Sequence, residues 1–131
     1  MNISADLWEA YQRTEYRIGA VILKVGEKSV GLNAEGKPWA YITAWNPGSE
    51  FLRESINRSR QEALESNLRK QGFACQRGVA RDPLGQWPDE EGILVFGIDR
   101  QRAIELGREF GQNAILVGVG DGTVELAVTE L

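Results

Sequence analysis

Residues 39–71, WAYITAWNPGSEFLRESINRSRQEALESNLRKQ, decide the fold because they join a strand to the longest helix of the chain. Between Trp39 and Trp45, small and aliphatic residues alternate with aromatic residues and threonine, which predicts a central strand covered on both faces. Asn46-Pro47-Gly48 ends this strand, since proline cannot extend a hydrogen-bonded ladder and glycine permits a turn. Ser49 can then cap a helix, and the pattern predicts this helix over residues 49–71.

One face of this predicted helix mixes apolar and polar side chains. At about 100° per residue, an apolar stripe is formed by Leu52, Ile56, Ala63, Leu64 and Leu68. Arg60 falls near the middle of the stripe, and Arg53, Asn57 and Asn67 also interrupt it. Polar groups that face a core need partners, either in a structural network or in a ligand. We therefore expect Arg60 to point toward the sheet and to mark a candidate site.

The rest of the chain predicts further strands and helices around this unit. We expect an N-terminal helical arm at residues 1–15, capped by Ser4, and a second long helix at 99–111, capped by Asp99. Strands are expected at 17–25, 73–81, 92–98, 114–119 and 123–128. The order helix, strand, strand, helix, strand, strand, helix, strand, strand predicts one α+β domain over residues 1–131. Its sheet should be antiparallel or mixed, with helices packed mainly on one face.

Composition restricts the classes of function. The formal charge of -4, from 15 Lys and Arg against 19 Asp and Glu, provides no overall attraction to phosphate backbones, so nucleic-acid binding is disfavoured. The chain has one cysteine and no histidine, which excludes an internal disulfide and any catalytic triad that uses histidine. No Cys/His cluster suggests a metal site, and we expect no cofactor.

The charge and hydropathy of the chain indicate its expected location in the cell. The first residues carry Asp6 and Glu9 in place of a basic segment followed by an apolar run, so no secretory leader is predicted. No stretch approaches the ~20 apolar residues of a membrane span. We expect a cytoplasmic protein without membrane contact.

Four segments together carry a resemblance to a known family. They are 40–47 (AYITAWNP), 57–60 (NRSR), 87–91 (WPDEE) and 110–114 (FGQNA). In these ordered motifs the chain resembles the bacterial family catalogued as domain of unknown function 3293, over about residues 16–125. The resemblance implies a small bacterial single-domain protein and brings no activity with it, so the site has to be argued from the residues.

The polar face of the long helix allows two interpretations. In the first, Arg60 binds an anionic or carbonyl group of a ligand while Asn57 and Asn67 orient it. In the second, Arg60 pairs with a buried acid such as Glu91, and the asparagines bond to loop backbone. Asn46 is likewise either a turn residue or part of an anion site at the start of the helix.

Two further groups are candidates for the same site. Gln112 and Asn113 follow a glycine that can end a helix, so they either serve the turn or bring their amides to the strand end near Asn46. Trp87 is either a loop anchor, a lid over a pocket or a partner-binding tip. Glu90 and Glu91 are adjacent at the start of a strand and should point to opposite faces, so one of them at most enters a given pocket.

These residues favour a binding or regulatory module over an enzyme. The predicted ligand is a small anionic or polar molecule or a peptide, bound by Asn46, Asn57, Arg60, Gln112, Asn113 and Trp87. The first alternative is a carboxylate-dependent enzyme in which Glu91 or Glu90 acts, with Glu91 as the weak catalytic candidate. The second alternative is an interaction protein such as a homodimer, formed through an edge strand or the Trp87 loop.

Overall fold

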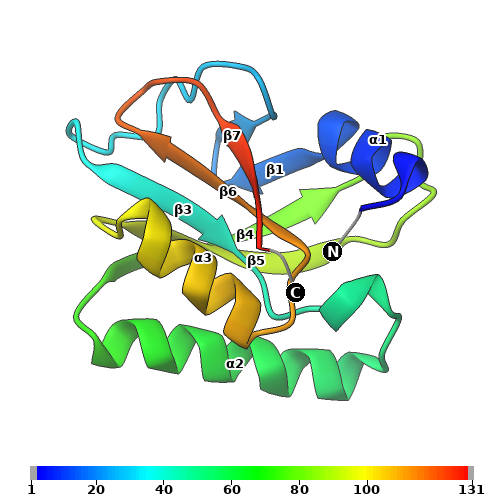
Figure 1. The fold of residues 1–131 in the computed structure, drawn as a ribbon. Helices are drawn as coiled ribbons and strands as arrows, with labels where there is room; N and C mark the ends of the chain where they lie inside the picture. The colour runs from blue at the N-terminus through cyan, green and yellow to red at the C-terminus, as the bar shows by residue number, and fades with distance from the viewer. Residues whose placement is uncertain (1–2, 130–131) are drawn as a thin grey trace.

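The computed structural model describes residues 3–129, and Figure 1 shows the arrangement of its elements. The helices are α1 (Ala5–Arg13), η1 (Pro47–Ser49, a 3-10 turn), α2 (Glu54–Lys70) and α3 (Arg100–Glu109). The strands are β1 (Glu15–Ile18), β2 (Val21–Leu23), β3 (Pro38–Ile42), β4 (Ala74–Arg81), β5 (Glu90–Phe96), β6 (Ala114–Val119) and β7 (Glu125–Val128). The predicted order of elements is recovered, with one additional strand near the N-terminus.

The strands form one curled antiparallel sheet in the order β2-β1-β4-β5-β3-β6-β7. β3 pairs with β5 on one side and with β6 on the other, so the segment predicted to be central is central. The expected hairpin near the C-terminus is also present, with β6 and β7 in antiparallel register. The chain is therefore a single α+β domain, as its sequence predicts.

The prediction of one strand over residues 17–25 is wrong. This stretch folds back on itself, and β1 pairs with β2 so that Tyr16 lies opposite Leu23. The turn passes through Gly19, whose φ of +58° suits a residue without a side chain. The β-branched residues of the run have high strand propensity on both sides of this turn, and for that reason the composition alone does not reveal it.

The helix ends follow the predictions only in part. Ser4 and Asp99 cap α1 and α3 as expected, because each side-chain oxygen accepts a hydrogen bond from the backbone N–H three residues later. Ser49 does not cap α2, which begins at Glu54, because Ser49 lies in η1 with a φ of +64°. Arg53 occupies the cap position without a side-chain hydrogen bond.

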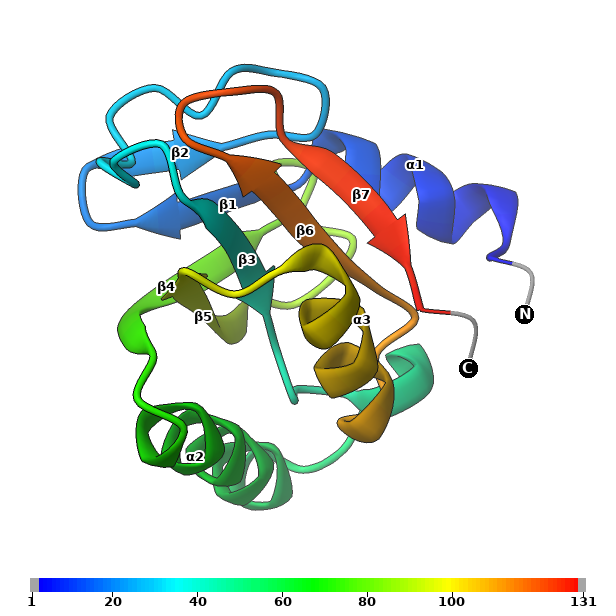
Figure 2. The ribbon, with the colours of Figure 1, turned by 60° about the vertical axis from the view of Figure 1, so that its left-hand side comes forward.

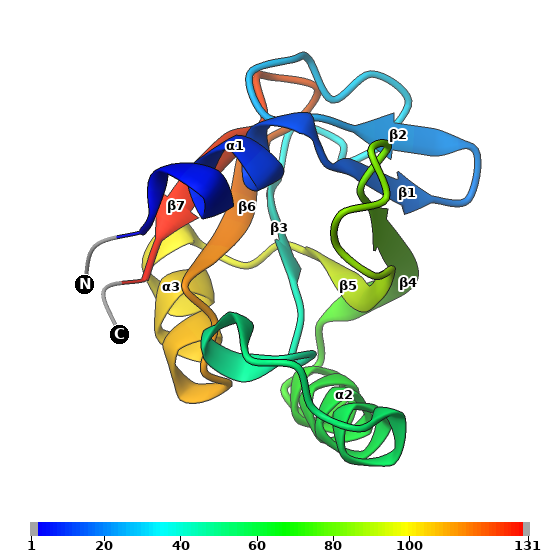
Figure 3. The same cartoon turned by 90° about the vertical axis from the view of Figure 1, so that its right-hand side faces the viewer.

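Helices cover the two faces of the sheet unequally. α2 and α3 pack on the face that carries Ala40 and Ile42 of β3, and a dry core of aliphatic side chains lies between them. The opposite face carries Trp39 and Tyr41, and the curled sheet closes over them together with α1 (Figure 2). Two of the three α-helices thus share one face, as predicted, and α1 lies on the other side of the sheet (Figure 3).

The buried face of α2 is rotated relative to the predicted one. Its buried residues are Asn57, Gln61, Leu64 and Leu68, whereas Ile56, at 45% exposure, faces outward. Arg53 and Ala63 are exposed as well, so their assignment to the inward stripe is wrong. The backbone of the chain leaving β3 needs hydrogen-bond partners, and the amide side chains of Asn57 and Gln61 supply them. These hydrogen bonds turn the polar side of α2 toward the end of β3.

Candidate functional site

The polar residues of α2 serve the backbone at the end of β3. Gln61 accepts a hydrogen bond from the backbone N–H of Ala44 at 2.9 Å. Asn57 accepts one from the backbone N–H of Asn46 at 2.8 Å and donates to the carbonyl of Leu52 at 3.1 Å. Because the strand has ended, these amides replace the missing ladder partners. The interpretation in which Asn57 bonds to loop backbone is therefore confirmed, and Gln61 is a member of this network that the helical pattern did not reveal.

Arg60 lies at the edge of the same network. Its guanidinium donates to the carbonyl of Ala44 at 3.0 Å and to the carbonyl of Phe110 at 2.6 Å. The side chain is half-buried and joins the end of β3 to the end of α3. The ion pair with an acid such as Glu91, which was part of the second interpretation, is not formed, because Glu91 pairs with Arg58 at 2.8 Å. Arg60 points toward the sheet, but its hydrogen bonds are with backbone.

Gln112 and Asn113 bring the end of α3 to the same region. Gln112 donates from its amide nitrogen to the carbonyls of Trp45 at 3.2 Å and of Phe110 at 3.3 Å. Asn113 donates to the hydroxyl of Ser49 at 3.0 Å, while its buried amide oxygen has no partner among the described residues. Both side chains therefore form hydrogen bonds beyond the turn after α3, and these bonds connect the segment after β3 to the start of β6.

A partly open cavity of about 90 Å³ lies next to this network, on the other face of the sheet. Among the residues predicted for the site, Asn46, Gln112 and Trp87 line it. Asn57, Arg60, Asn113 and Glu91 do not line it. A single water needs roughly 10–15 Å³ of such space, so the cavity has room for a small molecule. The structure thus gathers part of the predicted set around one cavity.

Glu90 brings a carboxyl group into this cavity. Along β5, alternate residues face opposite sides of the sheet, so Glu90 shares a face with Gly92 and Leu94 while Glu91 points to the other face. The amide nitrogen of Asn46 donates to the Glu90 carboxyl at 3.1 Å. Burial raises the pKa of Glu90 to about 7, against the opposing effect of this hydrogen bond. The expectation that only one of the two glutamates enters a pocket is confirmed.

Tyr41 lines the same cavity as Glu90. Its ring packs over Gly92, where a Cβ atom would lie 2.4 Å from the Tyr41 hydroxyl, so this strand position requires glycine. The side chain is 3% exposed, and its hydroxyl has no hydrogen-bond partner within residues 3–129. Burial, followed by the nearby carboxyl of Glu90, raises the pKa of Tyr41, which keeps the phenol neutral. An unpartnered buried hydroxyl is costly and marks a position where a ligand group is favoured.

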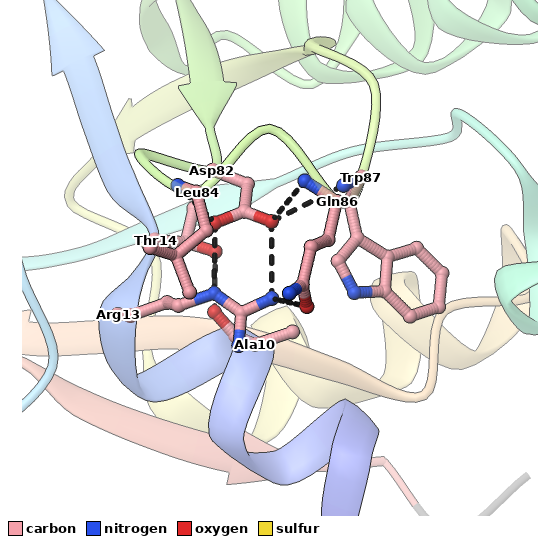
Figure 4. A network of polar contacts seen from close by, with 7 residues as sticks. All are labelled: Ala10, Arg13, Thr14, Asp82, Leu84, Gln86 and Trp87. Atoms are coloured by element: carbon pink, nitrogen blue, oxygen red, sulfur yellow. Dashed lines mark hydrogen bonds and ion pairs between the residues drawn. The ribbon is translucent and has the colours of Figure 1, made fainter.

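α1 covers the cavity and is held by a clasp at its C-terminal end (Figure 4). Arg13 makes two hydrogen bonds to the Asp82 carboxylate, at 2.8 and 3.0 Å. The same carboxylate accepts from the backbone N–H groups of Leu84, Gln86 and Trp87. The Arg13 guanidinium and these amides lower the pKa of Asp82, so it is charged at neutral pH. These hydrogen bonds of Arg13 and Asp82, called the Arg13–Asp82 clasp below, fix both α1 and the loop between β4 and β5.

Trp87 occupies the loop between β4 and β5. Its ring lies 5.7 Å from that of Phe51 in a tilted arrangement, and its side chain is half-buried while lining the cavity. The backbone N–H of Trp87 is tied to Asp82 at 3.1 Å. These contacts agree with the interpretation of Trp87 as a loop anchor, and they also place its ring at the cavity.

Sequence reasoning missed most of the aromatic lining. Tyr11 of α1, Tyr16 of β1 and Tyr41 of β3 all line the cavity, and Tyr16 meets Tyr41 edge to face at a centroid distance of 5.3 Å. Burial, followed by the nearby charge of Glu90, raises the pKa of Tyr11 to about 12. These residues lie on separate elements, so no local spacing connects them. For Glu90 the sequence did contain a signal, because the alternation along β5 places Glu90 on the same face of the sheet as the buried Leu94.

Within residues 3–129, no group of three or more His, Cys, Asp or Glu side chains is placed to hold a metal ion. None of the helices in that range has both the length and the apolar character needed to cross a bilayer.

The chain is a single α+β domain with a partly buried carboxyl in a cavity lined by several aromatic residues. A family model described as "Protein of unknown function (DUF3293)" matches residues 42–115, which is more than half of the chain. The chain belongs to this family, and the resemblance predicted from its motifs is confirmed. The matched segment is shorter than expected and does not include α1. Neither curated proteins nor solved structures give a significant match.

Proposed function

We propose that this protein is a binding module that holds a small polar ligand in the cavity beneath α1. The observation that supports this function is the Tyr41 hydroxyl, which is buried without a partner in the described structure and lies among the residues that line the cavity. Glu90 and Asn46 line the same space and already bond to each other. Buried polar atoms in folded proteins are nearly always hydrogen-bonded, so a ligand that satisfies Tyr41 gains free energy there.

The position of Arg60 narrows the class of ligand. We expected an Arg/Asn-lined site for an anionic or polar molecule, yet the Arg60 guanidinium is engaged by two backbone carbonyls and does not line the cavity. The cavity instead has the carboxyl of Glu90. An anion beside the ionised carboxyl would be repelled, and a cavity of this small volume suits a small molecule better than a peptide. The proposed ligand is therefore polar and not anionic.

Thermal unfolding with a panel of small molecules tests this proposal. The panel consists of cationic, neutral and anionic compounds of up to about six heavy atoms, each at 10 mM and pH 7.5. We expect at least one cationic or neutral compound to raise Tm, because a ligand that binds only the folded state stabilises it in proportion to ln(1 + [L]/Kd). No shift with any compound, or a shift with anions alone, would overturn the proposal.

A matched pair of variants shows whether the effect comes from this cavity. Ala10 is the buried residue of α1 and lines the cavity, so Ala10→Leu fills part of the space, while Ala5→Leu alters an exposed position of the same helix. The ligand-dependent shift should disappear in Ala10→Leu and persist in Ala5→Leu. Ala80→Met, at a half-buried lining position on β4, provides a second blocking variant if Ala10→Leu does not fold. An undiminished shift in the folded blocking variants contradicts the proposal.

A carboxylate-dependent enzyme is the second candidate function, supported by one observation. The pKa of Glu90 is raised to about 7, which is the range in which a carboxyl can both accept and donate a proton near neutral pH. In this function Glu90 replaces Glu91 as the acting carboxyl, since Glu91 points away from the cavity. Chemical analysis of a bound ligand after prolonged incubation separates the two functions: an unchanged ligand supports binding, and a conversion that Glu90→Gln abolishes supports catalysis.

A further inference from the structure

Glu90 is the carboxylate of the cavity that has no cationic partner among the ion pairs of residues 3–129. The other lining carboxylate, Asp82, is neutralised by Arg13 and by three backbone N–H groups. Arg58 pairs with Glu91, which points to the opposite face of β5. Glu90 therefore retains an uncompensated charge whenever it is ionised, and a cation is the group that best offsets it.

Four aromatic residues line the same cavity as this carboxylate. Tyr11, Tyr16, Tyr41 and Trp87 come from α1, β1, β3 and the β4–β5 loop, and all four line the cavity. The faces of aromatic rings carry partial negative charge and attract ammonium groups, more strongly when water is excluded. The combination of a carboxylate with several rings is chemically suited to an organic cation and offers little to an anion.

Hydrogen-bond acceptors complete the arrangement. An ammonium group has three N–H donors. The Glu90 carboxylate accepts one hydrogen bond from Asn46 and has further acceptor capacity for such donors, and the Tyr41 hydroxyl is buried without a partner in the described structure. The rest of the wall includes Leu7, Leu116 and Leu126, which favour a short hydrocarbon body. The acceptors therefore suit a charged ammonium end of a small molecule, and the apolar wall suits a hydrocarbon end.

We infer that the ligand of this cavity is a small primary alkylammonium ion, with its charged group between the Glu90 carboxylate and the Tyr41 hydroxyl. This inference rests on the proposed binding function and specifies the ligand class for that same cavity. The alkyl chain lies against the apolar wall under α1, and the aromatic rings exclude water from the charged end. Neutral alcohols of the same length lose the charge interaction, and carboxylates of the same length are repelled.

The inference predicts how binding depends on pH. The titratable groups that face Glu90 are Tyr11 from α1, Tyr16 from β1 and Tyr41 from β3, and burial raises the pKa of each, so all three stay neutral between pH 6 and 8. Asp82 is ionised throughout this range. Glu90, with a pKa of about 7, is the lining residue that changes charge. Affinity for an alkylammonium ion should therefore rise about tenfold from pH 6 to pH 8 as the carboxylate forms.

Titration by two-dimensional amide NMR, at constant ionic strength, tests the inference with three probes of matched length. These probes are propylammonium, propan-1-ol and propionate. We expect propylammonium at pH 8 to shift the amide signals of residues lining the cavity, with at least tenfold higher affinity than propan-1-ol and no saturable effect of propionate. Equal affinity for propylammonium and propan-1-ol overturns the ammonium inference while leaving the binding function intact. No saturable effect of any probe, together with no thermal shift across the panel, removes both.

Variants of the adjacent glutamates provide the matched control. Glu90→Gln should weaken propylammonium binding at pH 8 by tenfold or more and remove its pH dependence, because the amide keeps the shape without the charge. Glu91→Gln alters the neighbouring residue outside the cavity and should leave both unchanged. Tyr41→Phe removes the hydroxyl that has no protein partner and should weaken binding severalfold without lowering Tm. Unchanged propylammonium binding in Glu90→Gln contradicts the inference.

Discussion

The two faces of β3 differ in how they treat polar groups. On the face of Ala40 and Ile42, α2 and α3 enclose a core in which Leu64, Leu68 and Leu106 are fully buried. On the face of Trp39 and Tyr41, the layer includes a cavity and a hydroxyl without a partner. On the well-packed face the polar residues Asn57 and Gln61 make structural hydrogen bonds, whereas on the other face polar groups lie beside unfilled space, and the ligand is proposed there for that reason.

The helices on the two faces are also attached differently. α2 is held by buried leucines and by amide side chains that complete the end of β3. α1 has Ala10 as its buried residue and is fixed by the Arg13–Asp82 clasp. Burial of apolar surface is spread over a whole helix face, while a clasp depends on one group of hydrogen bonds.

The largest effect should come from emptying the packed face. Leu64→Ala removes a side chain with 0% exposure from the core under α2 and should lower the free energy of unfolding by about 3 kcal/mol. Leu7→Ala, at a half-buried position that lines the cavity, should cost less than about 1 kcal/mol. Urea denaturation measures both values. Equal losses would mean that the two faces are packed alike.

A smaller and pH-dependent effect should come from Glu90. Its pKa is about 7 in the folded protein and near the usual 4.5 in the unfolded chain, so the folded state loses stability as pH rises from 4.5 through 7. Glu90→Gln removes this loss and should raise the free energy of unfolding at pH 8 by about 2 kcal/mol, which is less than the roughly 3 kcal/mol that the two pKa values imply because the carboxyl is partly exposed to solvent. Little change is expected at pH 4.5. Urea denaturation from pH 4.5 to 8 checks the profile. Glu91→Gln is the control and should show no such trend.

The smallest effect should come from Arg60. Arg60→Met keeps much of the aliphatic stem and removes the donors to the carbonyls of Ala44 and Phe110, which should lower the free energy of unfolding by about 1 kcal/mol. Because Arg60 does not line the cavity, propylammonium affinity should stay within twofold of the wild type. Denaturation combined with the NMR titration measures both quantities. A large loss of affinity at unchanged stability would show that Arg60 contributes to ligand binding.

The sequence was sufficient to predict most of the fold. The alternation in Trp39–Trp45, the caps at Ser4 and Asp99, and the glycines near residue 120 all led to elements that the structure contains. The prediction failed in the 17–25 run, because strand propensity does not locate a turn between two short strands. It also failed for Ile56, because the rotation of α2 is set by hydrogen bonds to a segment distant from the helix pattern itself.

The cavity was harder to predict for a different reason. Asn46, Gln112 and Trp87 were identified because each lies beside a turn or a loop signal, and the structure places all three on the cavity wall. Tyr11 and Tyr41 look like ordinary core residues in the sequence, and only the curl of the sheet brings them to Glu90. Proximity between distant segments is a property of the tertiary fold, so helix and strand periodicity do not carry it.

The clasp between Arg13 and Asp82 connects access to the cavity with the proton of Glu90. Asp82 begins the loop that leads to Glu90, and Arg13 ends the helix that shields it. Displacing α1 would hydrate the carboxyl, and hydration lowers its pKa toward the ordinary value. At neutral pH an opened cavity would therefore release a proton, and a more acidic solution would favour the closed one.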